Sequence, residues 1–102
     1  MHFPRRRVFT VVGILAMSLL PAAPALATVV NVGGGTWNYG SSYSFPSTKN
    51  AWSHYVHPTK YHSATSICGS ENHKVYNVAG SWANANSQCN VFQSDAAYWA
   101  TY

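Results

Sequence analysis

Four histidines, His54, His57, His62 and His73, are the side chains whose type and clustering could bind a metal ion. Side chains alternate along a strand, so His54 and His57, three residues apart, would point to opposite faces and could not easily share an ion. H-x-x-H spacing is a weak zinc signal without a helix or a cysteine pair. The spacing favours partly exposed hairpin histidines, and we predict no metal and no cofactor.

Hydrolysis is a second chemistry to weigh, because His62 is followed directly by Ser63. A serine nucleophile needs a base that is oriented by a third group, and adjacent strand residues face opposite ways. Only Glu71 and Asp95 could serve as acids in the predicted mature chain, which leaves a glycosidase no carboxylate beyond its obligatory two. We therefore predict a protein without enzymatic activity, with peptidoglycan hydrolysis as the remaining catalytic alternative.

The sequence contains two cysteines, Cys68 and Cys89, which allow one pairing. In an exported chain thiols are normally oxidised. Closing a loop of about 20 residues contributes about 3 kcal/mol in the chain-entropy account. We predict a structural Cys68–Cys89 disulfide.

The N-terminus has the pattern of an export signal. Arg5 to Arg7 precede an apolar segment from Val8 to Leu20, and the small-x-small triplet ends at Ala27. This segment is too short to span a bilayer, which takes about 20 apolar residues. We expect a signal peptide at residues 1–27, cleavage between Ala27 and Thr28, and one secreted domain at residues 28–102, with the general and twin-arginine routes both open.

Removal of the signal changes the composition. Every arginine, leucine and methionine lies within residues 1–27, so the mature chain carries three lysines against two acidic residues. Nucleic-acid binding depends on several basic contacts to phosphates, and three scattered lysines do not supply them. The four tryptophans and seven tyrosines all remain. They favour a binding protein, since these rings suit surfaces that are apolar at one end and wet at the other.

Short alternating segments between turn residues predict an all-β fold, either a sandwich or a small barrel. The segment 82–85 could instead form one helical turn. The expected strands are Val29–Val32, Thr36–Tyr39, Ser42–Phe45, Ala51–His57, His62–Cys68, Lys74–Val78, Ser81–Ala85, Gln88–Phe92 and Ala97–Tyr102.

Pro58 indicates a turn between the fourth and fifth of these strands, because its φ angle is preset for the second turn position. A four-residue loop would pair His57 with His62 across a hairpin, whereas a two-residue loop would pair Tyr55 with His62. Both registers stay open.

A set of residues runs in order along almost the whole of residues 28–102: Gly35, Thr36, Trp37, Tyr39, Gly40, Ser41, Ser42, Tyr43, Tyr55, His57, Lys60, His62, Ser63, Ala64, Thr65, Ala79, Gly80, Trp82, Ala83, Ala85, Tyr98 and Trp99. Through these residues the chain resembles the lactococcin 972 family of secreted bacterial bacteriocins.

The resemblance implies a small β-sandwich of two antiparallel sheets that inhibits cell-wall synthesis at the septum of related bacteria by binding lipid II. It also implies that membrane proteins of the producer handle export and immunity. The cysteine pair and the low basic charge depart from the family pattern. A secreted envelope protein with a structural or adhesive role and no toxicity is the alternative.

The candidate target-binding residues follow from this hypothesis. Glycines 33–35 permit a backbone concavity for a pyrophosphate, although they could also be a flexible lead-in to the first strand. Aromatic rings could stack on sugars, and loop tips on rigid strands often carry recognition. The candidates are Gly34, Gly35, Trp37, Tyr39, Tyr55, His57, Lys60 and His62.

Overall fold

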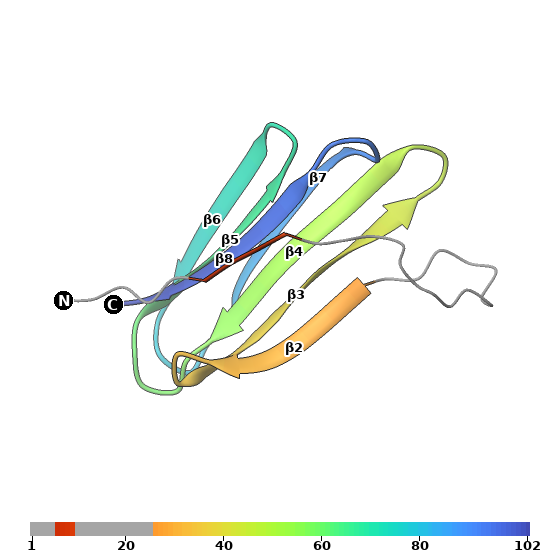
Figure 1. The fold of residues 1–102 in the computed structure, drawn as a ribbon. Helices are drawn as coiled ribbons and strands as arrows, with labels where there is room; N and C mark the ends of the chain where they lie inside the picture. The colour runs from red at the N-terminus through yellow and green to blue at the C-terminus, as the bar shows by residue number, and fades with distance from the viewer. Residues whose placement is uncertain (1–5, 10–25) are drawn as a thin grey trace.

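The computed structural model describes residues 6–9 and 26–102, and this part of the chain folds into β-strands without a helix (Figure 1). The strands are β1 (Arg6–Phe9), β2 (Leu26–Val32), β3 (Gly35–Ser44), β4 (Thr48–Val56), β5 (His62–Cys68), β6 (Glu71–Asn77), β7 (Ala83–Asn90) and β8 (Asp95–Thr101).

The strands form two antiparallel sheets that pack face to face. Sheet 1 has the order β1-β8-β5-β6, and sheet 2 has the order β2-β3-β4-β7. The chain passes from sheet 2 to sheet 1 between β4 and β5, returns between β6 and β7, and crosses again between β7 and β8. The predicted all-β fold is confirmed, and of the two architectures that the strand pattern allowed the protein adopts the sandwich.

The predicted hairpin around Pro58 is wrong. β4 pairs with β3 and β7, whereas β5 pairs with β6 and β8, so the loop joins strands of different sheets. Neither proposed register exists. Tyr55 lies opposite Trp37 and Ala83 in sheet 2, whereas His62 lies opposite Thr101 in sheet 1. Tyr55 and His62 are both fully buried, and the loop places them on facing inner surfaces of the two sheets.

Two pairs of predicted strands are each one continuous strand. β3 runs through Gly40, where the backbone of Leu26 on β2 lies too close to leave room for a Cβ atom, so this glycine serves sheet pairing. β7 alternates inward alanines and serine with outward asparagines and glutamine, which is a period of two. The helical turn considered for residues 82–85 does not form.

The predicted signal peptide lies partly within the described residues. β1, which the sequence pattern did not predict, covers the end of its basic segment and the first two residues of its apolar segment, and it pairs with β8. Residues 10–25, with most of the apolar segment, lie outside the described residues. The expected cleavage site falls inside β2, after the pairs Leu26 with Ser41 and Ala27 with Gly40. Cleavage there would leave β2 paired from Thr28 onward.

The core is built from three large aromatic side chains and many alanines. Tyr55 of sheet 2 stacks on Trp99 of sheet 1 with ring centroids 5.1 Å apart. Trp37 Nε1 donates to Ser53 Oγ at 2.9 Å, and Ser53 Oγ donates across the sandwich to the carbonyl of Tyr98. The alanines that surround these rings are Ala64, Ala83, Ala85 and Ala97.

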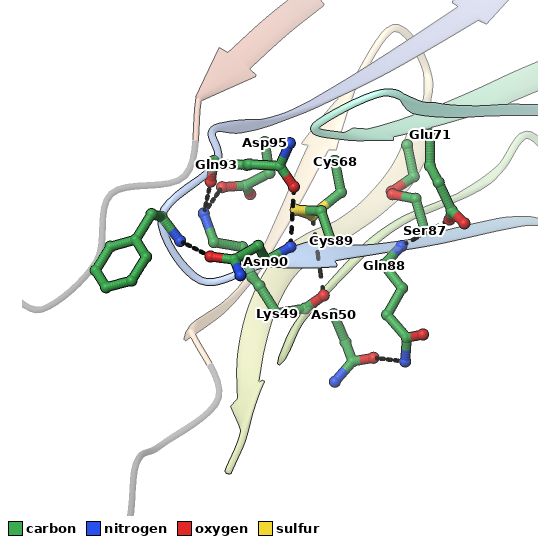
Figure 2. The surroundings of a disulfide bond; sticks show 12 residues. Lys49, Asn50, Cys68, Glu71, Ser87, Gln88, Cys89, Asn90, Gln93 and Asp95 are labelled. Carbon is green, nitrogen blue, oxygen red and sulfur yellow. Dashed lines mark hydrogen bonds and ion pairs between the residues drawn. A yellow bond between two sulfur atoms is a disulfide. The ribbon is translucent and has the colours of Figure 1, made fainter. Parts of the chain in front are cut away.

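A covalent and an ionic link join the sheets at the opposite end from the Pro58 loop (Figure 2). The predicted disulfide is confirmed: Cys68 of β5 is bonded to Cys89 of β7. Beside it, Lys49 Nζ forms a buried ion pair with Asp95 Oδ1 at 3.0 Å. We call this region the disulfide end.

The first prediction concerns the disulfide. Replacing Cys68 and Cys89 together with alanine should lower the free energy of unfolding by about 3 kcal/mol, because the unfolded chain loses a constraint that closes a loop with a sequence separation of 21. Urea unfolding measures the change, and intact mass should show two thiols in the parent only after reduction. Free thiols in the native protein would contradict the assignment.

The second prediction concerns Tyr55, whose hydroxyl donates to the carbonyl of Val32 at 2.8 Å. Burial raises the pKa of Tyr55 to about 12, against a smaller lowering by a hydrogen bond at Gly35. The stability that it contributes is complete below its unfolded pKa of 10.0 and is lost as pH rises through about 12.

We therefore expect stability to fall between pH 10 and pH 12 in the parent and to fall less in Tyr55→Phe. Denaturant unfolding at several pH values measures this, with Tyr43→Phe at a half-buried position as the control. Equal pH profiles for the parent and Tyr55→Phe would contradict the prediction.

Candidate functional site

Three loops meet at the end of the sandwich that lies away from the disulfide. They are the β2–β3 turn, the β4–β5 loop at residues 57–61, and the β6–β7 loop at residues 78–82. The turn consists of Gly33 and Gly34, with φ angles of 61° and 87°. Two successive positive φ angles make a tight hairpin turn that residues with a Cβ atom adopt at a cost. We call this region the glycine end.

His57 connects these three loops. Its Nδ1 accepts hydrogen bonds from the backbone N–H groups of Thr59 at 3.1 Å and Lys60 at 3.0 Å. That nitrogen therefore carries no proton, and Nε2–H donates to the carbonyl of Gly33 at 3.1 Å. The carbonyl of His57 accepts a hydrogen bond from Gly80 N. One buried side chain thus fixes the loop that presents Lys60.

His62 makes a second connection beneath the loops. Its Nδ1 lies 2.8 Å from the carbonyl oxygen of Lys60, and its Nε2 lies 2.7 Å from that of Ser81. Both partners are carbonyl acceptors, so a ring nitrogen that carries a proton donates to one of the two loops. His62 is completely buried and therefore acts on the surface through the loops that it holds.

The glycines are required by packing as well as by backbone conformation. A Cβ atom at Gly33 would overlap the ring of Trp99, and one at Gly34 would lie 2.9 Å from His57 Nε2. The glycine run is thus the turn of the β2–β3 hairpin, packed on core side chains. The alternative of a flexible lead-in to the first strand is wrong.

A shallow open depression of about 620 Å³ lies across this end. Backbone atoms form much of its surface, because glycines of two loops contribute to it. Its lining also offers one amide and one hydroxyl side chain, which could bind polar groups of a ligand. The lining residues are Asn31, Val32, Gly33, Gly34, Gly35, Thr36, Val56, Pro58 and Gly80.

The candidate target-binding residues separate into two groups. Gly34, Gly35, His57 and Lys60 come together at the glycine end, with Lys60 as an exposed side chain. The others belong to the interior or pack against it. Trp37, Tyr55 and His62 are fully buried, and the ring of Tyr39 lies tilted against that of Trp37 with centroids 4.1 Å apart.

Sequence reasoning missed a cluster of exposed tyrosines beside this site. The rings of Tyr61, Tyr76 and Tyr102 lie on the outer face of sheet 1, with centroid separations of 5.8 to 6.0 Å. We call these three residues the tyrosine platform. Tyr61 directly follows Lys60, so the platform borders the glycine end. The spacing of two residues between Tyr61 and Ser63 could have indicated that Tyr61 lies on the outer face. It could not have indicated the other two rings, which come from other strands.

Lys74 gives the platform a positive charge. Its Nζ lies 5.1 Å from the ring centroid of Tyr76, and a hydrogen bond with Tyr76 raises the pKa of Lys74. Burial alone would raise the pKa of Tyr102, but its hydrogen bond with Ser63 and the charge of Lys74 outweigh burial and lower it. The phenols therefore lie in a positive local potential.

Acidic side chains lie elsewhere in the described chain. Asp95 is paired with Lys49 at the disulfide end, where Glu71 Oε1 accepts a hydrogen bond from Gln88 N. Residues 6–9 and 26–102 contain no group of three histidine, cysteine or acidic side chains that could hold a metal ion. Nor do these residues form any helix of the length and apolarity needed to cross a bilayer.

The part of the chain that runs from the glycine turn to the final strand matches a known protein family. The family described as Bacteriocin (Lactococcin_972) matches residues 33–99. The chain belongs to the lactococcin 972 family. Membership of this bacteriocin family implies an action on target bacteria. No curated protein and no solved structure matches the chain.

The match begins at Gly33 and ends at Trp99, the two residues that pack against each other at the glycine end. The resemblance inferred from single residues is thus confirmed. Many of the residues that carry it are buried in the sandwich rather than exposed to solvent.

The third prediction concerns the His57 connection. His57→Ala should lower the free energy of unfolding by about 1 to 3 kcal/mol, because it removes three part-buried hydrogen bonds that hold backbone groups of two loops. His54→Ala is the matched control, since His54 is a partly exposed histidine of β4 whose one hydrogen bond, to Asn86, lies at the surface. Urea unfolding of both variants measures the difference, and equal losses would contradict this role of His57.

Proposed function

We propose that the protein is a secreted bacteriocin that binds lipid II and thereby inhibits cell-wall synthesis at the septum of related bacteria. The observation that carries the proposal is the family match over residues 33–99. Lipid II presents a pyrophosphate, two sugars and a peptide at the membrane surface. A protein that recognises it needs polar and aromatic groups on one accessible surface, and the glycine end offers both.

Export is part of the proposal. The signal peptide at residues 1–27 would be removed between Ala27 and Thr28, and the mature domain would be released from the producer. Membrane proteins of the producer would serve export and immunity. The mature domain would reach its target from outside, where a disulfide persists.

The pyrophosphate would bind around Lys60. Residues 28–102 contain no arginine, so a bidentate guanidinium contact is not available to the mature domain. Lysine, hydroxyl groups and backbone N–H groups bind phosphates in other proteins. Lys60 is exposed on a loop that His57 and His62 hold, and Gly34 and Thr36 lie at the adjoining depression.

Action without catalysis is supported by how the acidic and nucleophilic groups are used. Asp95 is buried in its ion pair, and Glu71 lies at the disulfide end. His62 points into the core, whereas Ser63 points outward to the hydroxyl of Tyr102 at 3.0 Å. These two residues are adjacent in sequence but lie on opposite faces of sheet 1.

A structural or adhesive envelope protein is the second candidate. Two phenylalanines favour it: Phe45 and Phe92, on turns at the disulfide end, are 95% and 92% exposed. A hydrogen bond from Val91 N to the carbonyl of Ser47 joins the two turns. Exposed rings of this kind suit attachment to another surface.

The fourth prediction tests the lipid II proposal at Lys60. Lys60→Gln in the secreted protein should weaken binding to lipid II in bilayers roughly tenfold, because a charge-assisted contact to phosphate is lost. Growth inhibition of related strains should fall in parallel. Asn86→Asp changes the net charge by the same amount on the outer face of sheet 2 and should leave both unchanged.

Undecaprenyl phosphate in the same bilayers controls for attraction to a phosphate alone. A parent protein that neither binds lipid II nor inhibits growth would favour the envelope alternative. Release of muropeptides from purified cell wall would contradict action without catalysis.

A further inference from the structure

The tyrosine platform is assembled from three adjacent strands of sheet 1. Tyr61 immediately precedes β5, Tyr76 lies on β6, and Tyr102 follows β8. Ser63 of β5 lies between them, opposite Tyr76 on one side and Ala100 on the other. Its hydroxyl is buried beneath the rings and is hydrogen-bonded to Tyr102 Oη. The platform therefore has a fixed base.

The platform is not part of the hydrophobic core. Tyr61, Tyr76 and Tyr102 are 47%, 46% and 37% exposed, whereas the core aromatics Trp37 and Tyr55 are almost completely buried. The planes of Tyr61 and Tyr76 differ by 13°, so these two rings lie nearly parallel. Three neighbouring rings that stay open to solvent form a contact surface for a ligand with a flat apolar face.

The positive charge near the platform indicates which ligands it could bind. Lys74 shares the outer face with Tyr76, and Lys60 adjoins Tyr61. Both acidic side chains of the mature domain lie at the disulfide end. A cationic ligand would be repelled by the lysines, although it would otherwise suit aromatic rings. An anionic group is attracted by the same charge of Lys74 that, after the hydrogen bond with Ser63, helps to lower the pKa of Tyr102.

An acidic sugar has all three features that the platform favours in a ligand: a flat apolar face, several hydroxyl groups and a negative charge. Its C–H face can stack on tyrosine rings, its hydroxyls can bond with the phenols, and its carboxylate or phosphate can approach Lys74. We propose that the tyrosine platform is a binding site for a hexopyranose that carries an anionic substituent. The inference rests on the proposed function, because lipid II is the natural source of such a sugar: its muramic acid carries the pyrophosphate as the anionic group, whereas the lactyl carboxyl is amide-bonded to the peptide.

The position of the platform fits a ligand that also reaches Lys60. Lys60 and Tyr61 are consecutive, and the carbonyl of Tyr61 accepts a hydrogen bond from Tyr102 N. A pyrophosphate at Lys60 would leave an attached sugar near the first ring of the platform. One ligand can therefore touch the glycine end and the platform together.

The fifth prediction uses NMR titration of the isotope-labelled secreted protein with three soluble probes: N-acetylmuramic acid, N-acetylglucosamine 1-phosphate and neutral N-acetylglucosamine. Shifts should concentrate on the three tyrosine rings and Lys74, and the acidic probes should bind about threefold more tightly than the neutral one. Response to one acidic probe alone identifies whether carboxylate or phosphate is recognised.

Two variants test the assignment. Tyr76→Leu should weaken all three probes about fivefold through loss of ring stacking, while Tyr43→Leu, which removes a half-buried tyrosine of β3, should not. Lys74→Met should abolish the preference for acidic probes and retain binding of the neutral sugar. Lys74→Met also keeps the proposal testable if Tyr76→Leu does not fold.

The outcomes separate this inference from the lipid II proposal. The platform inference is wrong if the sugars leave the platform residues unperturbed and Tyr76→Leu binds lipid II like the parent. That result leaves the proposed function intact. Sugar binding at the platform without any binding of lipid II supports the platform and overturns the function. Perturbation of the same rings by phosphatidylglycerol vesicles but by no sugar overturns the inference in favour of a membrane contact.

Discussion

The stacking of Tyr55 on Trp99 is the contact on which the glycine end depends, because it joins the two sheets where neither a disulfide nor an ion pair does so. The residues around this pair are mainly alanines, which let the sheets approach closely but bury little area each. Large rings therefore supply most of the apolar burial. At the other end, Cys68 and Cys89 hold the sheets covalently.

The same aromatic pair positions the surface above it. The ring of Trp99 fills the space where Gly33 would otherwise carry a side chain, and the hydroxyl of Tyr55 holds the carbonyl of Val32 just before the turn. His57 then ties the turn to the loop of Lys60. A buried stack thus fixes the backbone that a ligand would meet.

The sequence was sufficient for the class of fold and for the disulfide, since strand-forming residues and two cysteines in a chain predicted to be exported are local signals. It was insufficient for the path of the chain. Pro58 predicts a turn, but turn chemistry does not state whether the next strand pairs with the previous one or enters another sheet. The tyrosine platform was missed for the same reason: Tyr61, Tyr76 and Tyr102 become neighbours through the order β8-β5-β6, which is non-local.

The few charged side chains of residues 28–102 lie in different parts of the sandwich, so that recognition of a charged ligand would be local. Asp95 neutralises Lys49 inside the disulfide end, so that lysine adds little to the outer field. Lys60 remains exposed, and Lys74 remains exposed beside Tyr76. Two cations next to open aromatic rings can select an anion that is attached to a sugar, whereas so small a total charge gives weak long-range attraction. Specificity in such a surface arises from contact geometry, which the buried rings and histidines hold in place.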